Sequence, residues 1–135
     1  DAYLSDLALG ILDVLRAHHT REHTVGQRKY VFPNPEAPDG HIKPNGISHA
    51  AQRSNRILLK AGTIEGRWTP HDLRRTAATQ MTRMGHTRLV VDKILGHKDT
   101  SVAGIYDRHA YTDERRVALD AWAEQLREIV EVGDE

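Results

Sequence analysis

Two histidines, an arginine and a tyrosine lie within a short part of the chain, and together these residue types can transfer a phosphoryl group. His71 and Arg74 are three positions apart, a spacing that puts both on one face of a helix. His97 ends a Leu-Gly-His sequence, and Tyr106 follows it by nine residues. A phenol can attack phosphorus, a histidine can take its proton, and an arginine can form paired hydrogen bonds to phosphate oxygens. We predict that the four side chains line one concave site that fits a phosphate.

The elements that position these residues are predicted to be helices. Apolar residues recur at helical spacing, and the expected helices cover 5–18, 48–60, 69–84, 87–95 and 112–130, with a short sixth after 99–100 that carries Tyr106. Residues 20–47 hold four of the five prolines, so we expect a long irregular loop there, pinned to the core by residues 30–32. No strand pattern is apparent, and the predicted fold is mainly α.

The helix that carries His71 has the clearest start. Thr69 is a suitable N-cap, Pro70 fits the first helical position, and Asp72 falls three residues after the cap, as in a capping box. Gly85 and Gly96 are expected to end this helix and the next one. The sides expected to be buried in the helices at 48–60 and 112–130 are Ala50, Ile57, Leu58 and Ala61, and then Val117 or Ala118, Trp122, Leu126, Ile129 and Val130. Trp68 is also expected in the core.

Composition limits the function classes. The chain has 135 residues, no cysteine and zero net charge, and no apolar run long enough for a membrane span, so we expect one domain, or part of one, in the cytoplasm. Residues 52–116 carry a net charge of +6 and residues 117–135 a net charge of −5. The basic block fits a phosphate-binding face or, equally, a solvated helical surface. His18, His19 and His23 are interpreted as loop residues and not as metal ligands.

The ordered motifs resemble those of the tyrosine recombinase, or phage integrase, family. The resemblance rests on the segment from His71 to Thr79 (HDLRRTAAT), on the Leu-Gly-His sequence ending at His97, and on Tyr106. Residues 4–9 and 30–33 are also similar to that family. The resemblance implies that residues 1–135 are the C-terminal portion of one DNA breaking-and-rejoining catalytic domain, with its small sheet mostly missing from this chain.

The resemblance also implies roles for the residues. Tyr106 would form a 3′-phosphotyrosyl bond to double-stranded DNA, Arg74 would bind the non-bridging oxygens, His71 would accept or orient the tyrosine proton, and His97 would hydrogen-bond the scissile phosphate. Arg75 and Lys98 would contact neighbouring phosphates. The implied activity is site-specific integration or excision by a recombinase of a prophage or other mobile element. The resemblance further implies that the full-length protein would act as a tetramer on DNA, without cofactor, metal, membrane or small-molecule substrate.

The family's first catalytic arginine and its hairpin lysine normally precede the first helix expected here. Because the chain starts at Asp1, both are expected to lie outside it, and the chain alone is expected to cleave DNA poorly. Tyr111 is a rival nucleophile, although its spacing from His97 does not match the family. Two other functions stay open: a non-catalytic DNA-binding relative of the same fold, and a small helical interaction domain.

Overall fold

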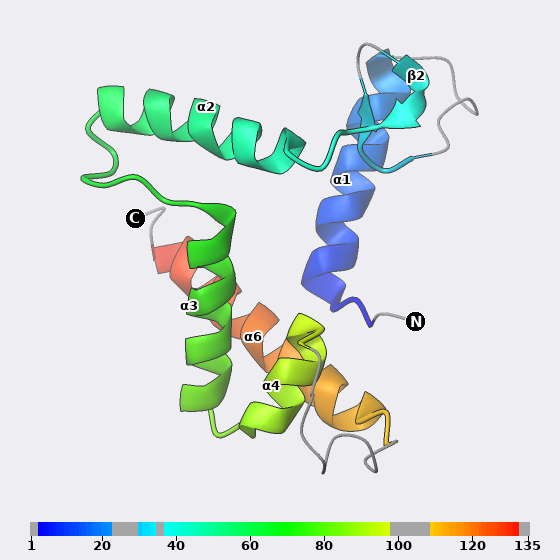
Figure 1. The fold of residues 1–135 in the computed structure, drawn as a ribbon, viewed down its shortest axis with the longest axis vertical. Helices are drawn as coiled ribbons and strands as arrows, with labels where there is room; N and C mark the ends of the chain where they lie inside the picture. Colours follow the sequence, from blue (N-terminus) through cyan, green and yellow to red (C-terminus); the bar gives the residue numbers. More distant parts are fainter. Residues whose placement is uncertain (1–2, 23–29, 35–36, 98–108, 133–135) are drawn as a thin grey trace. The chain divides into compact units, whose positions relative to one another are not determined.

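The computed structural model describes residues 3–22, 30–34, 37–97 and 109–132, and within them the chain is mainly helical, as predicted. The elements in chain order are α1 (Asp6–Glu22), β1 (Pro33–Asn34), β2 (Ala37–His41), α2 (Gly46–Lys60), α3 (Pro70–Arg83), α4 (Arg88–Leu95) and α6 (Thr112–Val132) (Figure 1). The five helices correspond to five predicted ones. The short helix expected around Tyr106 lies outside the described residues.

The chain divides into two compact units. One unit combines Asp1–Leu9 with Arg74–Glu135, and the other is the continuous segment Gly10–Leu73. The boundaries fall within α1 and α3, so each of these helices contributes to both units.

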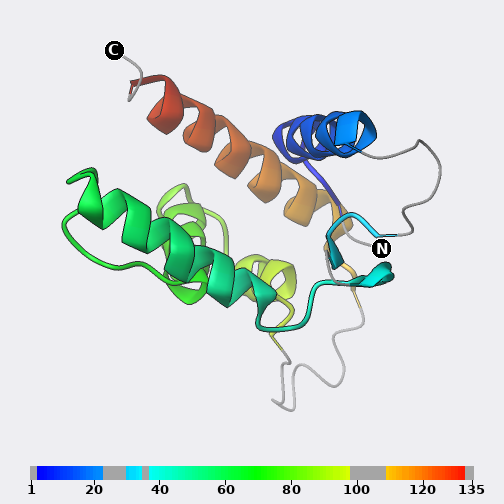
Figure 2. The same cartoon turned by 90° about the horizontal axis from the view of Figure 1, so that it is seen from above.

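The core of the first unit is built by α3, α4 and α6. Its buried side chains are Met81, Val90, Val91 and Ala118. α4 lies directly against α6, as the two views in Figures 1 and 2 show. Ala118 of α6 is fully buried in the same cluster as Val90 and Val91 of α4, and its small side chain lets the helices approach closely. The core is therefore compact and aliphatic apart from one methionine.

The predicted buried side of α6 is partly confirmed. Ala118 is buried and Trp122 packs against the core cluster. Of the alternatives Val117 and Ala118, the structure thus selects Ala118, and Val117 is more than half exposed. Ile129 and Val130 are also more than half exposed, so their placement in the core was wrong. Helical spacing identifies apolar stripes, but it does not say how much of a stripe another element covers.

In the second unit, α2 buries a different side from the predicted one. Ala51 and Asn55 are the buried residues of α2, whereas Ala50 and Ile57 are exposed and that prediction was wrong. Ala61 is also exposed, although it ends the helix as predicted, and Gly62 follows at φ +70°. The predicted face rested on apolar residues alone, while the structure buries a polar side chain that finds hydrogen-bond partners.

The segment 30–41 corrects two further predictions. β1 and β2 pair antiparallel, with Pro33 opposite His41, so a two-stranded sheet exists where a wholly irregular loop was expected. Val31 and Phe32 are 54% and 50% exposed, which contradicts the prediction that this apolar island pins the loop to the core. Tyr30 makes an edge-on ring contact with His41 at 5.3 Å between centroids. Proline and glycine conceal such a short strand pair from sequence patterns.

Candidate functional site

The N-terminus of α3 is formed as the sequence predicts. The backbone N–H and the hydroxyl of Thr69 donate to the Asp72 carboxylate at 3.0 and 2.7 Å, and the Thr69 hydroxyl accepts from the Asp72 N–H at 3.2 Å. This reciprocal capping box fixes the first turn of α3. His71 lies in that turn and is exposed. The free N–H groups of a helix start, together with the helix dipole, make such a turn favourable for an anion.

A buried amide on α2 holds the residue just before this cap. Asn55 is 5% exposed, and its Nδ2 donates to the Trp68 carbonyl at 2.6 Å while its Oδ1 accepts from the Trp68 N–H at 3.0 Å. Both backbone groups of Trp68 are thus satisfied by one side chain. Sequence reasoning missed Asn55, because nothing in its neighbourhood marks a polar residue as buried. Trp68 itself is only half-buried, so its predicted place in the core is confirmed in part.

Arg74 joins α3 to the end of α4. Its Nη2 donates a hydrogen bond to the carbonyl oxygen of Leu95, two residues before His97. The guanidinium has five N–H donors, so one such bond leaves others for a ligand. The first unit therefore brings Arg74 beside the Leu-Gly-His turn, although the two are 21 residues apart in sequence.

The Leu-Gly-His turn has the geometry of a glycine-terminated helix. Thr87 caps the start of α4, where its hydroxyl accepts from the Val90 N–H, and Gly96, which has φ +65°, caps its end. The Gly96 N–H donates to the Lys93 carbonyl at 3.2 Å, and the His97 N–H to the Asp92 carbonyl at 2.9 Å. This pair of bonds is a Schellman motif, which folds the chain back over the last helical turn. His97 is thereby placed above Asp92.

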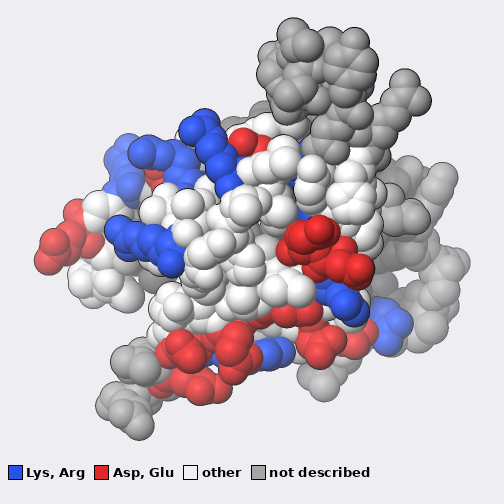
Figure 3. All heavy atoms as spheres, turned by 90° about the horizontal axis from the view of Figure 1, so that it is seen from below, with Lys and Arg blue, Asp and Glu red and all other residues white. Residues whose placement is uncertain are grey.

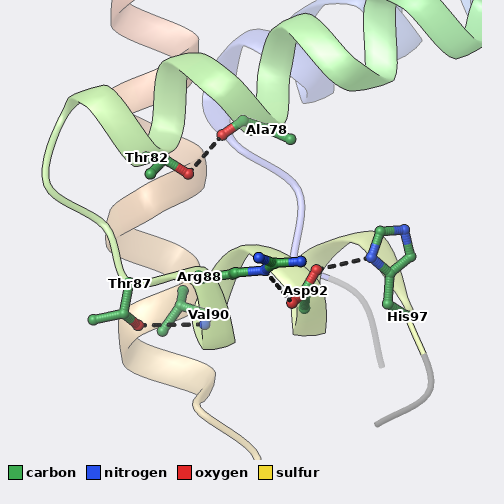
Figure 4. Close-up of polar contacts among 7 residues, drawn as sticks. All are labelled: Ala78, Thr82, Thr87, Arg88, Val90, Asp92 and His97. Carbon is green, nitrogen blue, oxygen red and sulfur yellow. Dashed lines mark hydrogen bonds and ion pairs between the residues drawn. The ribbon is translucent and has the colours of Figure 1, made fainter.

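Asp92 also holds the side chain of His97. Nδ1 of the imidazole lies 2.8 Å from Oδ1 of Asp92, and the Arg88 Nε lies 3.6 Å from the other carboxylate oxygen (Figure 4). The side chains of His97 and Asp92 are 54% and 37% exposed. One ring edge is therefore occupied by the carboxylate. Asp92 was not identified from the sequence. Its position could have indicated the contact, because it lies five residues before a histidine that follows a helix-ending glycine.

Three of the four predicted catalytic residues are described. His71 and Arg74 share α3, one turn apart, and Arg74 contacts the turn that leads to His97. Arg75 is exposed on α3. Tyr106 and Lys98 lie outside the described residues, so their predicted roles stay predictions.

The rival nucleophile Tyr111 is described and is half-buried. Its ring packs edge-on against His109 at 4.6 Å, and the Lys93 ammonium lies 5.8 Å from the ring centroid. Tyr111 has φ +50°, an uncommon backbone conformation for a residue other than glycine. Its ring packs against the core cluster, which gives it a structural role.

The described residues contain no group of three or more histidine, cysteine or acidic side chains arranged for a metal ion. Among the described helices, none is both long enough and apolar enough to cross a membrane. Charge is unevenly distributed over the surface, and acidic side chains gather along α6 (Figure 3).

Comparison with known proteins agrees with the family resemblance and with a mainly helical fold. A model of the phage integrase family matches residues 4–113, and the chain therefore belongs to the phage integrase family. Among its relatives are tyrosine recombinases called XerS from Streptococcus pneumoniae, for example from strains 70585 and JJA. Each of these two is 40% identical over 78 residues, which are 58% of this chain and 21% of the relative. The chain thus matches about a fifth of the length of these relatives. No solved structure matches the chain significantly.

Proposed function

We propose that this chain is part of the catalytic domain of a site-specific DNA recombinase that works through a phosphotyrosine intermediate. The observation that carries the proposal is the hydrogen bond from Arg74 to the Leu95 carbonyl, which brings an exposed guanidinium beside the turn that presents His97. Membership of the phage integrase family and the relatives named tyrosine recombinases support it.

In the proposed reaction the phenolic oxygen of Tyr106 attacks a phosphorus atom of one DNA strand. A bond forms between that oxygen and phosphorus while the bond from phosphorus to the 5′ oxygen breaks. The tyrosine proton passes to His71, and the leaving 5′ oxygen departs as a hydroxyl after protonation by the site. The 5′-hydroxyl of another strand then attacks the phosphotyrosine and restores both the phosphodiester and the phenol. The phosphate bond is conserved, so the cycle needs no further energy source.

The remaining side chains stabilise charge. The Arg74 guanidinium would bind the two non-bridging oxygens, which gain negative charge in the transition state, and His97 would donate a hydrogen bond to the same phosphate. Arg75 on the exposed surface of α3 and Lys98 after the Leu-Gly-His turn would bind neighbouring phosphates. In the second unit, Arg56 and Arg67 line a hollow of about 320 Å³, which adds positive charge suited to DNA.

The proposed partner is double-stranded DNA. Strand exchange between two duplexes requires four cleavages, so the proposed active assembly of the whole protein is a tetramer. Steep weakening of DNA binding with rising salt would support phosphate contacts by the basic block at 52–116.

The nucleophile assignment is tested by covalent trapping of the whole protein on a nicked DNA substrate. Tyr106→Phe removes one oxygen, and we expect it to abolish the protein–DNA adduct on a denaturing gel while DNA binding stays nearly unchanged. Tyr111→Phe is the control and is expected to retain the adduct. An adduct that survives Tyr106→Phe but not Tyr111→Phe would show that the nucleophile is misassigned. If the wild-type protein and both variants bind DNA and none of them forms an adduct, the protein is a non-catalytic DNA-binding relative.

A further inference from the structure

The Asp92 carboxylate determines which edge of the His97 ring is free. The Schellman bonds at the end of α4 fold the His97 backbone onto Asp92, and the 2.8 Å contact then ties Nδ1 of the ring to the Asp92 carboxylate. An ionised carboxylate only accepts hydrogen bonds, so the proton of this contact is on Nδ1. The opposite nitrogen, Nε2, is the one left for a ligand.

Asp92 is itself anchored. Its two carboxylate oxygens are divided between His97 and Arg88, with the Arg88 contact at 3.6 Å from an exposed guanidinium (Figure 4). Arg88 contacts Asp92 from the same helix, and Arg74 reaches the Leu95 carbonyl, two residues before His97, from α3. Both are cations, so Asp92 provides the negative charge beside the histidine.

A neutral imidazole has one N–H donor and one lone pair. If Nδ1 carries the proton, a neutral His97 presents only a lone pair at Nε2, and a lone pair cannot donate to a phosphate oxygen. The charged imidazolium donates from both nitrogens. The geometry therefore sets the protonation state in which His97 is able to bind phosphate.

We propose that Asp92 is a positioning residue that holds the Nδ1 edge of His97, so that His97 engages a DNA phosphate through Nε2 as the imidazolium. This inference rests on the proposed function, because it takes the phosphate as the ligand of His97. It adds a residue and a protonation state to that site. Asp92 does not touch the DNA and acts only through the histidine.

The direct test is the tautomer of His97, read from the ¹⁵N chemical shifts of its ring by NMR of the 135-residue chain. His97→Gln identifies the signal among the nine histidines. We expect the neutral ring to be protonated at Nδ1 in the wild type. In Asp92→Asn we expect a mixture of tautomers, because an amide can either accept from the ring or donate to it. Asp113→Asn is the matched control, since Asp113 is also an exposed acid paired with an arginine, at 3.6 Å from Arg116.

The second test measures single-turnover cleavage of a nicked DNA substrate by the whole protein. Loss of one donor to a developing charge costs about 10²–10³-fold in rate, which we expect for His97→Ala. Asp92→Asn disturbs only the orientation of that donor, so we expect a smaller loss of about tenfold in rate, with little change in DNA affinity. In the His97→Ala background, Asp92→Asn should have no further effect on the cleavage rate, because Asp92 acts only through His97.

A His97 tautomer that Asp92→Asn leaves unchanged would overturn the inference, as would an equal rate loss with and without His97. The backbone bond between His97 and Asp92 persists in the asparagine variant, so the helix end is expected to keep its shape. Failure of the proposed function is recognised separately. If the wild-type protein forms no DNA adduct, the proposed function is wrong. The tautomer measurement then still shows whether Asp92 determines which nitrogen of the His97 ring carries the proton.

Discussion

Replacing Asn55 by alanine is the sharpest test of how α2 supports the start of α3. The substitution removes both hydrogen bonds to the Trp68 backbone, at 2.6 and 3.0 Å, from a side chain that is 5% exposed. Each such bond contributes about 0.5–1.5 kcal/mol, and an unpaired buried partner costs about 1–3 kcal/mol. Because Trp68 is only half-buried, water replaces part of what is lost. We expect the free energy of unfolding to fall by about 2 kcal/mol.

The assay is urea denaturation followed by circular dichroism and tryptophan fluorescence. A loss of about 2 kcal/mol corresponds to a fall in Tm of about 6–10 °C for a chain of this size. Amide hydrogen exchange at Trp68 supplies the local readout, because its N–H loses its acceptor and should exchange faster. Asn55→Asp is expected to destabilise the chain at least as much, since it replaces the donor to the Trp68 carbonyl with a second acceptor.

Gln52→Ala is the matched control for Asn55→Ala. Gln52 lies on the same helix and is exposed, so its removal should change stability by at most about 0.5 kcal/mol. If Asn55→Ala is no more destabilising than Gln52→Ala, and Trp68 exchange is unchanged, the two hydrogen bonds do not anchor the start of α3.

Three further predictions concern the first unit. Arg74→Ala should abolish the DNA adduct and weaken DNA binding in gel-shift assays, and Arg74→Lys should restore little, because an ammonium cannot reproduce the planar fork of donors; full activity of either variant would contradict the proposed role. Met81→Ala should lower the free energy of unfolding by about 2–5 kcal/mol, since Met81 is 1% exposed. Val117→Ala should lower the free energy of unfolding far less, because Val117 is 56% exposed. Equal losses for Met81→Ala and Val117→Ala would show that Met81 is not a core residue. The hydrogen bond from the Tyr3 phenol to Asp120 raises the pKa of Tyr3. The stability that this bond contributes should therefore be present below the usual pKa of tyrosine and be lost as the pH rises through the pKa of Tyr3 in the folded state. In Asp120→Asn, NMR titration should show Tyr3 ionising at a lower pH.

Local interactions account for what could be predicted about the fold. The capping box of Thr69 and Asp72 and the turn at Gly96 are confirmed, because each depends on residues within one helical turn. The ends of α1, α4 and α6 were placed within a few residues for the same reason. The family was predicted from the order of the motifs, and the family match confirms that prediction. The roles of the individual site residues stay predictions.

Burial could not be predicted from spacing. Ile57 on α2 and Ile129 on α6 belong to apolar stripes yet are 68% and 55% exposed, because burial depends on which elements cover a stripe. The strand pair β1–β2 was missed since its residues have low strand propensity.

The helices and the caps of α3 and α4 could be predicted from the sequence, because they depend on contacts between near neighbours in the chain. The hydrogen bonds from Arg74 to the Leu95 carbonyl and from Asn55 to Trp68 could not be predicted in this way, because they join residues on different segments of the fold. The Asp92 contact with His97 lies between these cases: the two residues are five apart, but they meet only because Gly96 adopts a left-handed conformation that folds the chain back. Contacts between distant residues depend on how helices pack, and packing is settled by the shape and volume of all the side chains together.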